Sequence, residues 1–178
     1  CFFDIEVDFD PVRGFSKPND PFNAVTAISL YLDWMDKLIT LVVPPKSLSH
    51  ETAAEIVDRY ENCFLFERES DLLNAFLDLI DDADILSGWN SEGFDIPYMV
   101  MRTNRVLSRD DLRRFCLWGQ FPKERTFERF RAENLTFDLV GRVHMDYMQL
   151  YRKYTYEERH SYSLDAIGEY ELEERKVA

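Results

Sequence analysis

Residues 3–7 alternate apolar and polar side chains, which is typical of a β-strand, and two preceding apolar residues extend it to residues 1–7. Successive side chains of a strand point to opposite faces, so we expect Asp4 and Glu6 on one face. The opposite face, which can be buried, carries Phe3, Ile5 and Val7. Two carboxylates on one face repel each other, and a divalent cation would relieve that repulsion. The alternative is an edge strand whose two charges face water.

Further apolar stretches predict a series of strands and helices along the first half of the chain. The expected strands lie at residues 24–32, 37–43, 63–66 and 83–88, and the expected helices at residues 49–60 and 69–80. Residues 8–21 form a loop, because they contain three prolines and a glycine. Ser49 is placed to cap the first helix. We expect the first three strands to form an antiparallel meander and the last strand to complete an α/β crossover.

Residues 88–99 combine two glycines with several polar side chains at the junction between a strand and a helix. The glycines allow close approach of the backbone, and Pro97 suits the first turn of a helix, where its missing N–H needs no partner. Asp95 then lies at the helix N-terminus, where the helix dipole favours a carboxylate. A helix cap at Asp95 and a turn residue at Asn90 are the structural interpretation. The other interpretation is that Asp95 and Asn90 form a functional pair, placed one βα unit after the first strand.

The composition is that of a globular domain, with 46% hydrophobic and 15% aromatic residues and no apolar run long enough to cross a membrane. Three scattered cysteines indicate a reducing compartment, and they fit neither a zinc site nor a disulfide framework. At 178 residues, the chain suits a single domain over residues 1–178.

The net charge of −13 counts against nucleic acid as a partner, but the distribution of charge is uneven. Residues 102–131 hold nine basic and four acidic side chains. The basic ones are Arg102, Arg105, Arg109, Arg113, Arg114, Lys123, Arg125, Arg129 and Arg131. A solvated helix face with ion pairs three or four residues apart is one interpretation. A surface that follows the phosphates of a nucleic acid is the other.

Several segments resemble the exonuclease domains of the family B DNA polymerases. Residues 4–6, DIE, and residues 88–98, GWNSEGFDIPY, are similar to the first two exonuclease motifs of that family. Residues 146–153 and 161–165 are similar as well, most closely to members from tailed bacteriophages. The resemblance implies an α/β domain with the RNase H-like (DnaQ-like exonuclease) fold. Its mixed sheet combines an antiparallel meander with parallel strands and is flanked by helices.

The resemblance also implies proofreading, in which a 3′–5′ exonuclease removes 3′-terminal nucleotides from single-stranded or frayed DNA. Two Mg²⁺ or Mn²⁺ ions can activate a water and stabilise the leaving oxygen of such a hydrolysis. By resemblance, Asp4 bridges the two ions, Glu6 holds the ion on the side of the nucleophile, and Asp95 serves the other ion. These three residues are the expected catalytic residues and metal ligands.

Three residues are expected to bind the substrate: Asn90, Phe94 and Phe15. Asn90 would hold the site or the terminal nucleotide through hydrogen bonds. Phe15 resembles the family's residue that stacks on the strand end, and stacking suits a protein that binds single strands without sequence preference. A loop aromatic that covers the edge of the core is the alternative for Phe15. The implied partners are primer–template DNA and the rest of a polymerase chain, with no membrane, in the cytoplasm of a bacterium or a phage-infected host.

These exonucleases take a fourth carboxylate from a later helix, paired with a preceding tyrosine or histidine. The spacing of His160 and Asp165 matches the relatives that use histidine, so a free-standing histidine-type exonuclease is an alternative. In the polymerase family the segment around Tyr162 lies upstream of the third motif. We therefore expect the fourth ligand beyond Ala178, a chain truncated at both ends relative to its parent, and a structural role for Asp165. A binding module that keeps the fold without turnover is the remaining alternative.

Four further residues have simpler expected roles. Asp146 lies where a helix begins, so capping is its expected role. His50 and His144 have no partner pattern and are expected at the surface or at a helix start. Lys176 resembles a lysine that the family places near the site, and a surface position is the alternative.

Overall fold

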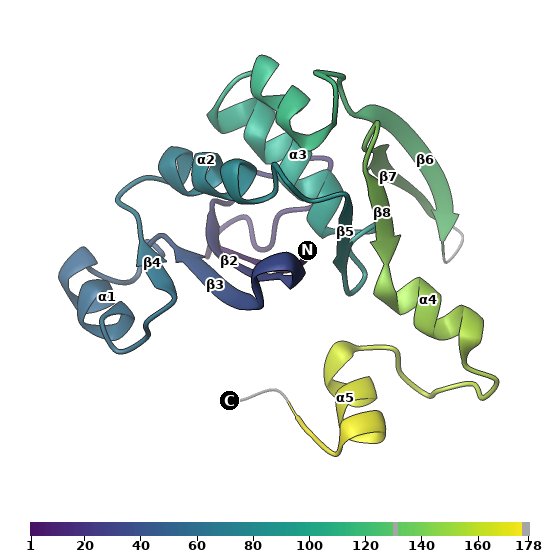
Figure 1. The fold of residues 1–178 in the computed structure, drawn as a ribbon. Coiled ribbons are helices and arrows are strands. Elements are labelled where there is room, and N and C mark those ends of the chain that lie inside the picture. Colours follow the sequence, from purple (N-terminus) through teal and green to yellow (C-terminus); the bar gives the residue numbers. More distant parts are fainter. Residues whose placement is uncertain (130–131, 176–178) are drawn as a thin grey trace.

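The computed structural model describes residues 1–129 and 132–175, which form a six-stranded mixed sheet and a two-stranded hairpin (Figure 1). The strand order of the large sheet is β4-β3-β2-β1-β5-β8. Its strands are β1 (Phe2–Val7), β2 (Val25–Leu32), β3 (Lys37–Val42), β4 (Cys63–Leu65), β5 (Ile85–Gly88) and β8 (Val143–Asp146). The hairpin consists of β6 (Lys123–Arg129) and β7 (Ala132–Asp138).

The predicted antiparallel meander is confirmed, because β2 pairs in antiparallel fashion with both β1 and β3. The other three strands are parallel to their neighbours: β4 to β3, β5 to β1, and β8 to β5. The expected crossover is also present, since α2 (Glu69–Leu79) lies between β4 and β5 in the chain and both strands run in the direction of β1. The sheet is therefore the predicted combination of a meander and parallel strands, with β1 in an interior position.

The helices predicted at residues 49–60 and 69–80 are present as α1 (His50–Val57), which ends earlier than expected, and α2. The other helices are α3 (Asp95–Val106), α4 (Tyr147–Tyr154) and α5 (Leu164–Leu172), with short 3₁₀ turns at Asp33–Met35 and Asp110–Phe115. Ser49 caps α1 as expected, because its hydroxyl accepts the backbone N–H of Thr52. Within the described part of the chain, no helix combines the length and the apolar character that crossing a membrane requires.

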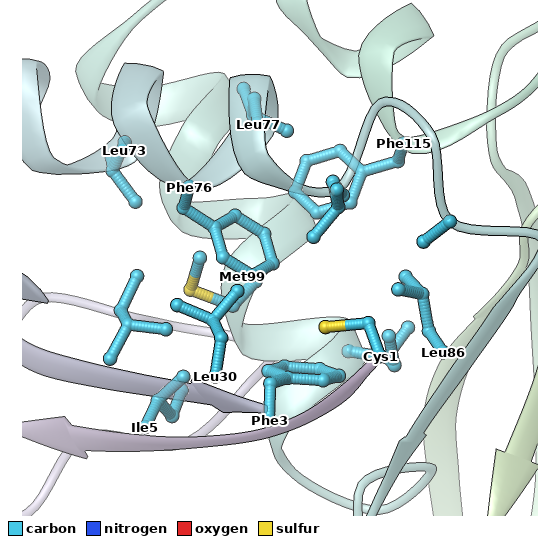
Figure 2. Packing of buried hydrophobic residues seen from close by; sticks show 14 of the residues in the cluster. Cys1, Phe3, Ile5, Leu30, Leu73, Phe76, Leu77, Leu86, Met99 and Phe115 are labelled. Atoms are coloured by element: carbon cyan, nitrogen blue, oxygen red, sulfur yellow. The ribbon is translucent and has the colours of Figure 1, made fainter. Parts of the chain in front are cut away.

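The hydrophobic core lies between the sheet and the helices α2 and α3, which cover one of its faces (Figure 1). Figure 2 shows Phe3 of β1 beneath Phe76 of α2, and their ring centroids are 5.6 Å apart. The predicted alternation along β1 is confirmed: Phe3 and Ile5 are buried, whereas Asp4 and Glu6 are exposed on the other face. Burial of side chains this large contributes about 1.5–3 kcal/mol each, so β1 is fixed in the sheet by its apolar face.

Two features of the second half of the chain were not predicted by the hydrophobic pattern. The hairpin β6–β7 packs its apolar residues Leu135 and Phe137 against the core. Strand β8 extends the sheet beyond β5 and leads directly into α4. The helix α5 lies toward the face of the sheet that α2 and α3 leave uncovered (Figure 1).

Candidate active site

Asp95 reaches from the start of α3 to the middle of β1. Its Oδ1 accepts a hydrogen bond from the backbone N–H of Ile5 at 3.2 Å. That N–H is accessible because β5 pairs with β1 at Phe2 and ends at Gly88, before it reaches the level of Ile5. The carboxylate of Asp95 is therefore held against the backbone between the two acidic residues of β1. The helix-cap interpretation is wrong for Asp95, since it is the first residue of the helix and bonds across to the sheet.

The environment of Asp95 favours its protonated form. The side chain is buried, and burial, together with the nearby negative charge of Asp4, raises the pKa of Asp95 from 3.8 to about 7. The hydrogen bond from Ile5 acts in the opposite direction, because it stabilises the carboxylate. Near neutral pH, the protonated and charged forms of Asp95 therefore coexist unless a positive charge compensates for Asp4.

Gly88 allows the turn after β5 to approach β1 closely. A Cβ atom at this position would lie 2.7 Å from the carbonyl oxygen of Phe3 and 2.9 Å from the Cβ of Ser91. Atoms at such distances overlap, so any side chain here would push the turn away from β1. The expected close approach of the backbone is confirmed at Gly88, and it is what brings Asn90 and Asp95 beside the acidic strand.

Asp146, at the end of β8, holds the same turn through its backbone. Its Oδ1 accepts the N–H of Asn90 at 3.1 Å, and its Oδ2 accepts the N–H of Glu92 at 3.2 Å. Oδ1 also accepts the N–H of Met148 at 3.0 Å, which confirms the predicted cap of α4. Asn90 has a positive φ of 61°, a conformation that asparagine tolerates better than most residues. The buried carboxylate of Asp146 therefore supports both the helix start and the turn.

His144 is a second support of this turn, and its expected place at the surface or a helix start is wrong. It lies on β8, and its Nε2 forms a 2.8 Å hydrogen bond with the hydroxyl of Ser91. Burial lowers the pKa of His144, so the imidazole is neutral at physiological pH. The parallel pairing of β8 with β5 places this histidine beside the turn, and that pairing was not predicted. His50, in contrast, is exposed at the start of α1 as expected.

Two cavities open beside these residues, and Trp89 lines both. The first, of about 340 Å³, includes Asp4 and Gly88. The rest of its lining is Phe2, Phe3, Ser29, Tyr31, Leu38, Tyr147 and Leu164. The second, of about 780 Å³, includes Asn90 and lies between the hairpin β6–β7, α4 and the segment before α5. Open space therefore lies beside Asp4 on the acidic strand and beside Asn90 in the turn after β5.

A family model described as DNA polymerase family B, exonuclease domain, matches residues 1–167. The chain belongs to this family. The DNA-directed DNA polymerase of Enterobacteria phage T4 is 29% identical over 129 residues, which are 71% of this chain and 14% of the phage protein. That of Escherichia phage RB69 is 27% identical over 194 aligned positions, covering 98% of this chain and 21% of the phage protein. The DNA polymerase delta catalytic subunit of Bos taurus is 34% identical over 62% of this chain and 10% of that subunit.

The exonuclease domain thus spans less than a quarter of the length of these two phage polymerases. Its RNase H-like fold, predicted from the motifs, is confirmed by the family match and by the mixed sheet. Exonucleases of this family depend on divalent metal ions. The carboxylate oxygens of Asp4, Glu6 and Asp95 are hard ligands that suit such ions. The negative charge of Asp4 contributes to the raised pKa of Asp95, so these two carboxylates lie near each other.

Asp95 contacts the strand that carries Asp4 and Glu6, but the described part of the chain holds no complete set of metal ligands. Among residues 1–129 and 132–175, no group of three or more His, Cys, Asp or Glu side chains is arranged to hold a metal ion. Asp165 is exposed in the first turn of α5, and His160 lines the larger cavity together with Asn90. Lys176 lies outside the described residues. The roles of these residues in the exonuclease domain stay predictions.

The two expected aromatic contacts with substrate differ in exposure. Phe15 is 74% exposed on the loop between β1 and β2, with its ring centroid 4.9 Å from that of Phe9. Phe94 is half-buried and stacks on Tyr98, with ring centroids 5.3 Å apart. Phe15 is therefore presented to solvent, whereas Phe94 packs mainly against the exonuclease domain itself.

Several arginines of residues 102–131 form ion pairs within the exonuclease domain. Arg102 and Glu69 are 2.6 Å apart and nearly buried, and Arg114 lies 2.7 Å from Asp78. Arg125 of β6 lies 2.5 Å from Glu92, which joins the hairpin to the turn after β5. Internal ion pairing therefore accounts for these three arginines. Arg131, which also belonged to the predicted basic stretch, lies outside the described residues.

Proposed function

We propose that this domain is a proofreading 3′–5′ exonuclease that hydrolyses 3′-terminal nucleotides of single-stranded or frayed DNA. The observation that carries the proposal is the contact of Asp95 with β1, which brings one carboxylate of the second motif beside the acidic residues of the first. Membership of the exonuclease family supports the same reaction. The larger parent protein that the relatives suggest would supply the primer–template DNA and the other polymerase regions.

Asp4, Glu6 and Asp95 are the residues that would hold Mg²⁺ or Mn²⁺ ions. Bound there, two such ions would activate a water and stabilise the leaving 3′ oxygen. Asp95 must be deprotonated to act as a ligand. Positive charge beside Asp4 would lower the raised pKa of Asp95. The buried position of Asp95 and its hydrogen bond to Ile5 fix the direction in which its other oxygen points.

Asn90 and Phe15 would hold the DNA without reading its sequence. Asn90 is fixed by the hydrogen bond from its backbone to Asp146 and lies at the edge of the larger cavity, which supports a role in holding the terminal nucleotide. The exposed ring of Phe15 is available to stack on a base, and every base offers such a face. Both interactions suit an enzyme that removes whichever nucleotide is at the 3′ end.

Degradation of a 5′-labelled single-stranded oligonucleotide, with Mg²⁺ or Mn²⁺ and with EDTA, tests the proposal. We expect stepwise metal-dependent shortening from the 3′ end that Asp4→Ala and Asp95→Ala abolish. Glu55→Gln on α1, a matched change of an exposed acid outside the site, should leave it unchanged. The expected fourth ligand beyond Ala178 could leave the isolated domain inactive, so the assay is repeated with the chain extended past Ala178. Binding of the oligonucleotide without hydrolysis in both forms would favour a binding module without turnover.

The same assay separates the two interpretations of the fourth carboxylate. Loss of hydrolysis in both His160→Ala and Asp165→Ala would favour the histidine type, in which these residues are the base and the fourth ligand. Retention of activity in both variants would support the structural role proposed for Asp165 at the start of α5.

A further inference from the structure

Phe15 protrudes into solvent, but the residues on either side of it are anchored. The carbonyl oxygen of Gly14 accepts a hydrogen bond from the side-chain amide of Asn23 at 3.1 Å. Ser16 is buried, and its hydroxyl accepts the backbone N–H of Asn23 at 3.4 Å. Hydrogen bonds therefore hold the residues on both sides of the exposed ring.

The anchor of this loop is the hydroxyl group of Tyr98. It donates a hydrogen bond to the carbonyl oxygen of Asn23 at 2.8 Å, which uses its single proton. The hydroxyl of Ser16, 2.5 Å away, is therefore the donor in the second bond. Tyr98 is completely buried, so both bonds form away from water, where leaving a polar group unpaired is costly.

Tyr98 belongs to the helix that carries Asp95. It lies one turn into α3, its backbone N–H binds the carbonyl of Phe94, and its ring stacks on the ring of Phe94. Tyr98 thus contacts both the start of α3, which carries Asp95, and the loop that presents Phe15. These contacts connect the proposed base-stacking ring to the acidic site through a single rigid aromatic residue.

We infer that Tyr98 is a positioning residue that sets the location of Phe15 relative to Asp95 and thereby determines how tightly the 3′-terminal base is held. The inference rests on the proposed function, in which Phe15 stacks on the end of the strand. Tyr98 itself touches neither the DNA nor the metal ligands in this scheme. Its hydroxyl acts only through the loop of residues 8–24.

A double-mutant cycle between Tyr98→Phe and Phe15→Ala tests the inference. The probe is a short single-stranded oligothymidylate whose 3′-terminal base is the fluorescent analogue 2-aminopurine, titrated in EDTA so that it is not hydrolysed. Phe15→Ala should weaken binding about tenfold, the size of one base–aromatic stack. Tyr98→Phe, which keeps the ring stacked on Phe94 but removes both hydrogen bonds, should weaken it by a similar factor. The double variant should bind no more weakly than Phe15→Ala alone.

Two further variants separate positioning from a general loss of structure. Ser16→Ala changes the loop and removes one of the two hydrogen bonds of the Tyr98 hydroxyl. It should weaken binding of the probe, as Tyr98→Phe does, and again only while Phe15 is present. Tyr170→Phe removes a tyrosine hydroxyl that lies 3.4 Å from Glu157, away from the loop, and should leave binding unchanged. Thermal unfolding of every variant confirms that binding is measured on folded protein.

The outcomes distinguish this inference from the proposed function beneath it. If Phe15→Ala weakens binding but Tyr98→Phe does not, or if their effects multiply in the double variant, the positioning role is overturned and the stacking role stands. If Phe15→Ala leaves binding unchanged, or the unaltered domain does not bind the probe, stacking by Phe15 is itself wrong and the inference fails with it. Equal, non-additive losses support both.

Discussion

Asp95 and Ile5 are ninety positions apart in the chain, and a 3.2 Å hydrogen bond from the backbone N–H of Ile5 to Oδ1 of Asp95 joins them. The bond holds a buried carboxylate against the strand that carries the exposed acids Asp4 and Glu6. Hydrogen bonding favours the charged form of Asp95, but burial and the charge of Asp4 outweigh it and raise the pKa to about 7. The acidic cluster is therefore under electrostatic strain near neutral pH, and a bound cation would relieve that strain.

This strain predicts how the stability of the metal-free domain depends on pH. The pKa of Asp95 is higher in the folded state, so the folded protein binds the proton more tightly than the unfolded chain. The associated stability is fully present below about pH 4 and is lost as the pH rises through about 7. A shift from 3.8 to about 7 corresponds to roughly 4 kcal/mol in the free energy of unfolding. Urea denaturation in EDTA at several pH values measures it.

Asp95→Asn is the matched variant for that measurement. The amide oxygen can still accept the N–H of Ile5, but the side chain no longer titrates. We expect the variant to be more stable than the unaltered domain at pH 7.5 in EDTA, with the difference vanishing toward pH 4. An equal pH dependence in both proteins would show that other groups are responsible.

Asp4→Asn should relieve the same repulsion from the other side. Removing this charge lowers the pKa of Asp95, because Asp4 is the second largest cause of its elevation after burial. Titration of the Asp95 carboxyl carbon by NMR measures the change directly. Saturating Mg²⁺ should raise the melting temperature of the unaltered domain, since a ligand that binds only the folded state stabilises it. The increase should be smaller in Asp4→Asn, and an identical increase would exclude Asp4 as a ligand.

The sequence was most informative where a local pattern determines the structure. The alternation in β1 and the spacing of Leu72, Leu73, Phe76 and Leu77 in α2 predicted which side chains are buried, because burial follows the period of each element. The hairpin β6–β7 was missed because its first strand, KERTFER, is dominated by charged residues. The hydrogen bonds of Asp95 with Ile5 and of His144 with Ser91 were also missed. Both depend on which strands pair with β5, and that is a tertiary property that no local pattern records.

Gly88→Ala should disrupt the site through a steric effect alone. Its new Cβ would lie 2.7 Å from the backbone oxygen of Phe3, which cannot move without displacing β1. We expect the free energy of unfolding to fall by about 1–3 kcal/mol, as for overpacking of a core. Hydrolysis should fall as well, because the turn carries Asn90 away from β1. Gly168→Ala in α5 is the control away from the site. Its Cβ would lie 3.2 Å from the carbonyl oxygen of Glu174, so this contact offsets part of the about 0.5–1 kcal/mol that alanine gains over glycine in a helix, and hydrolysis should stay unchanged.

Asp146→Asn should loosen the turn while it keeps the cap of α4. Asparagine caps a helix as well as aspartate does, so an amide oxygen in the place of Oδ1 still accepts the N–H groups of Met148 and Asn90. The amide nitrogen would replace Oδ2 and face the N–H of Glu92, so that hydrogen bond is lost. An unpaired group of this kind costs about 1–3 kcal/mol.

The consequence of Asp146→Asn for activity distinguishes a support of the turn from a simple helix cap. If the carboxylate holds the turn, amide hydrogen exchange at Glu92 should accelerate and hydrolysis of the oligonucleotide should slow, while exchange within α4 stays unchanged. Ser49→Ala is the matched control, because it removes the cap of α1 at a cost of about 1 kcal/mol without touching the site. Faster exchange throughout α4, with unaltered exchange at Glu92, would reduce Asp146 to a cap. The geometry predicts the opposite, since two of its three backbone partners, Asn90 and Glu92, lie in the turn.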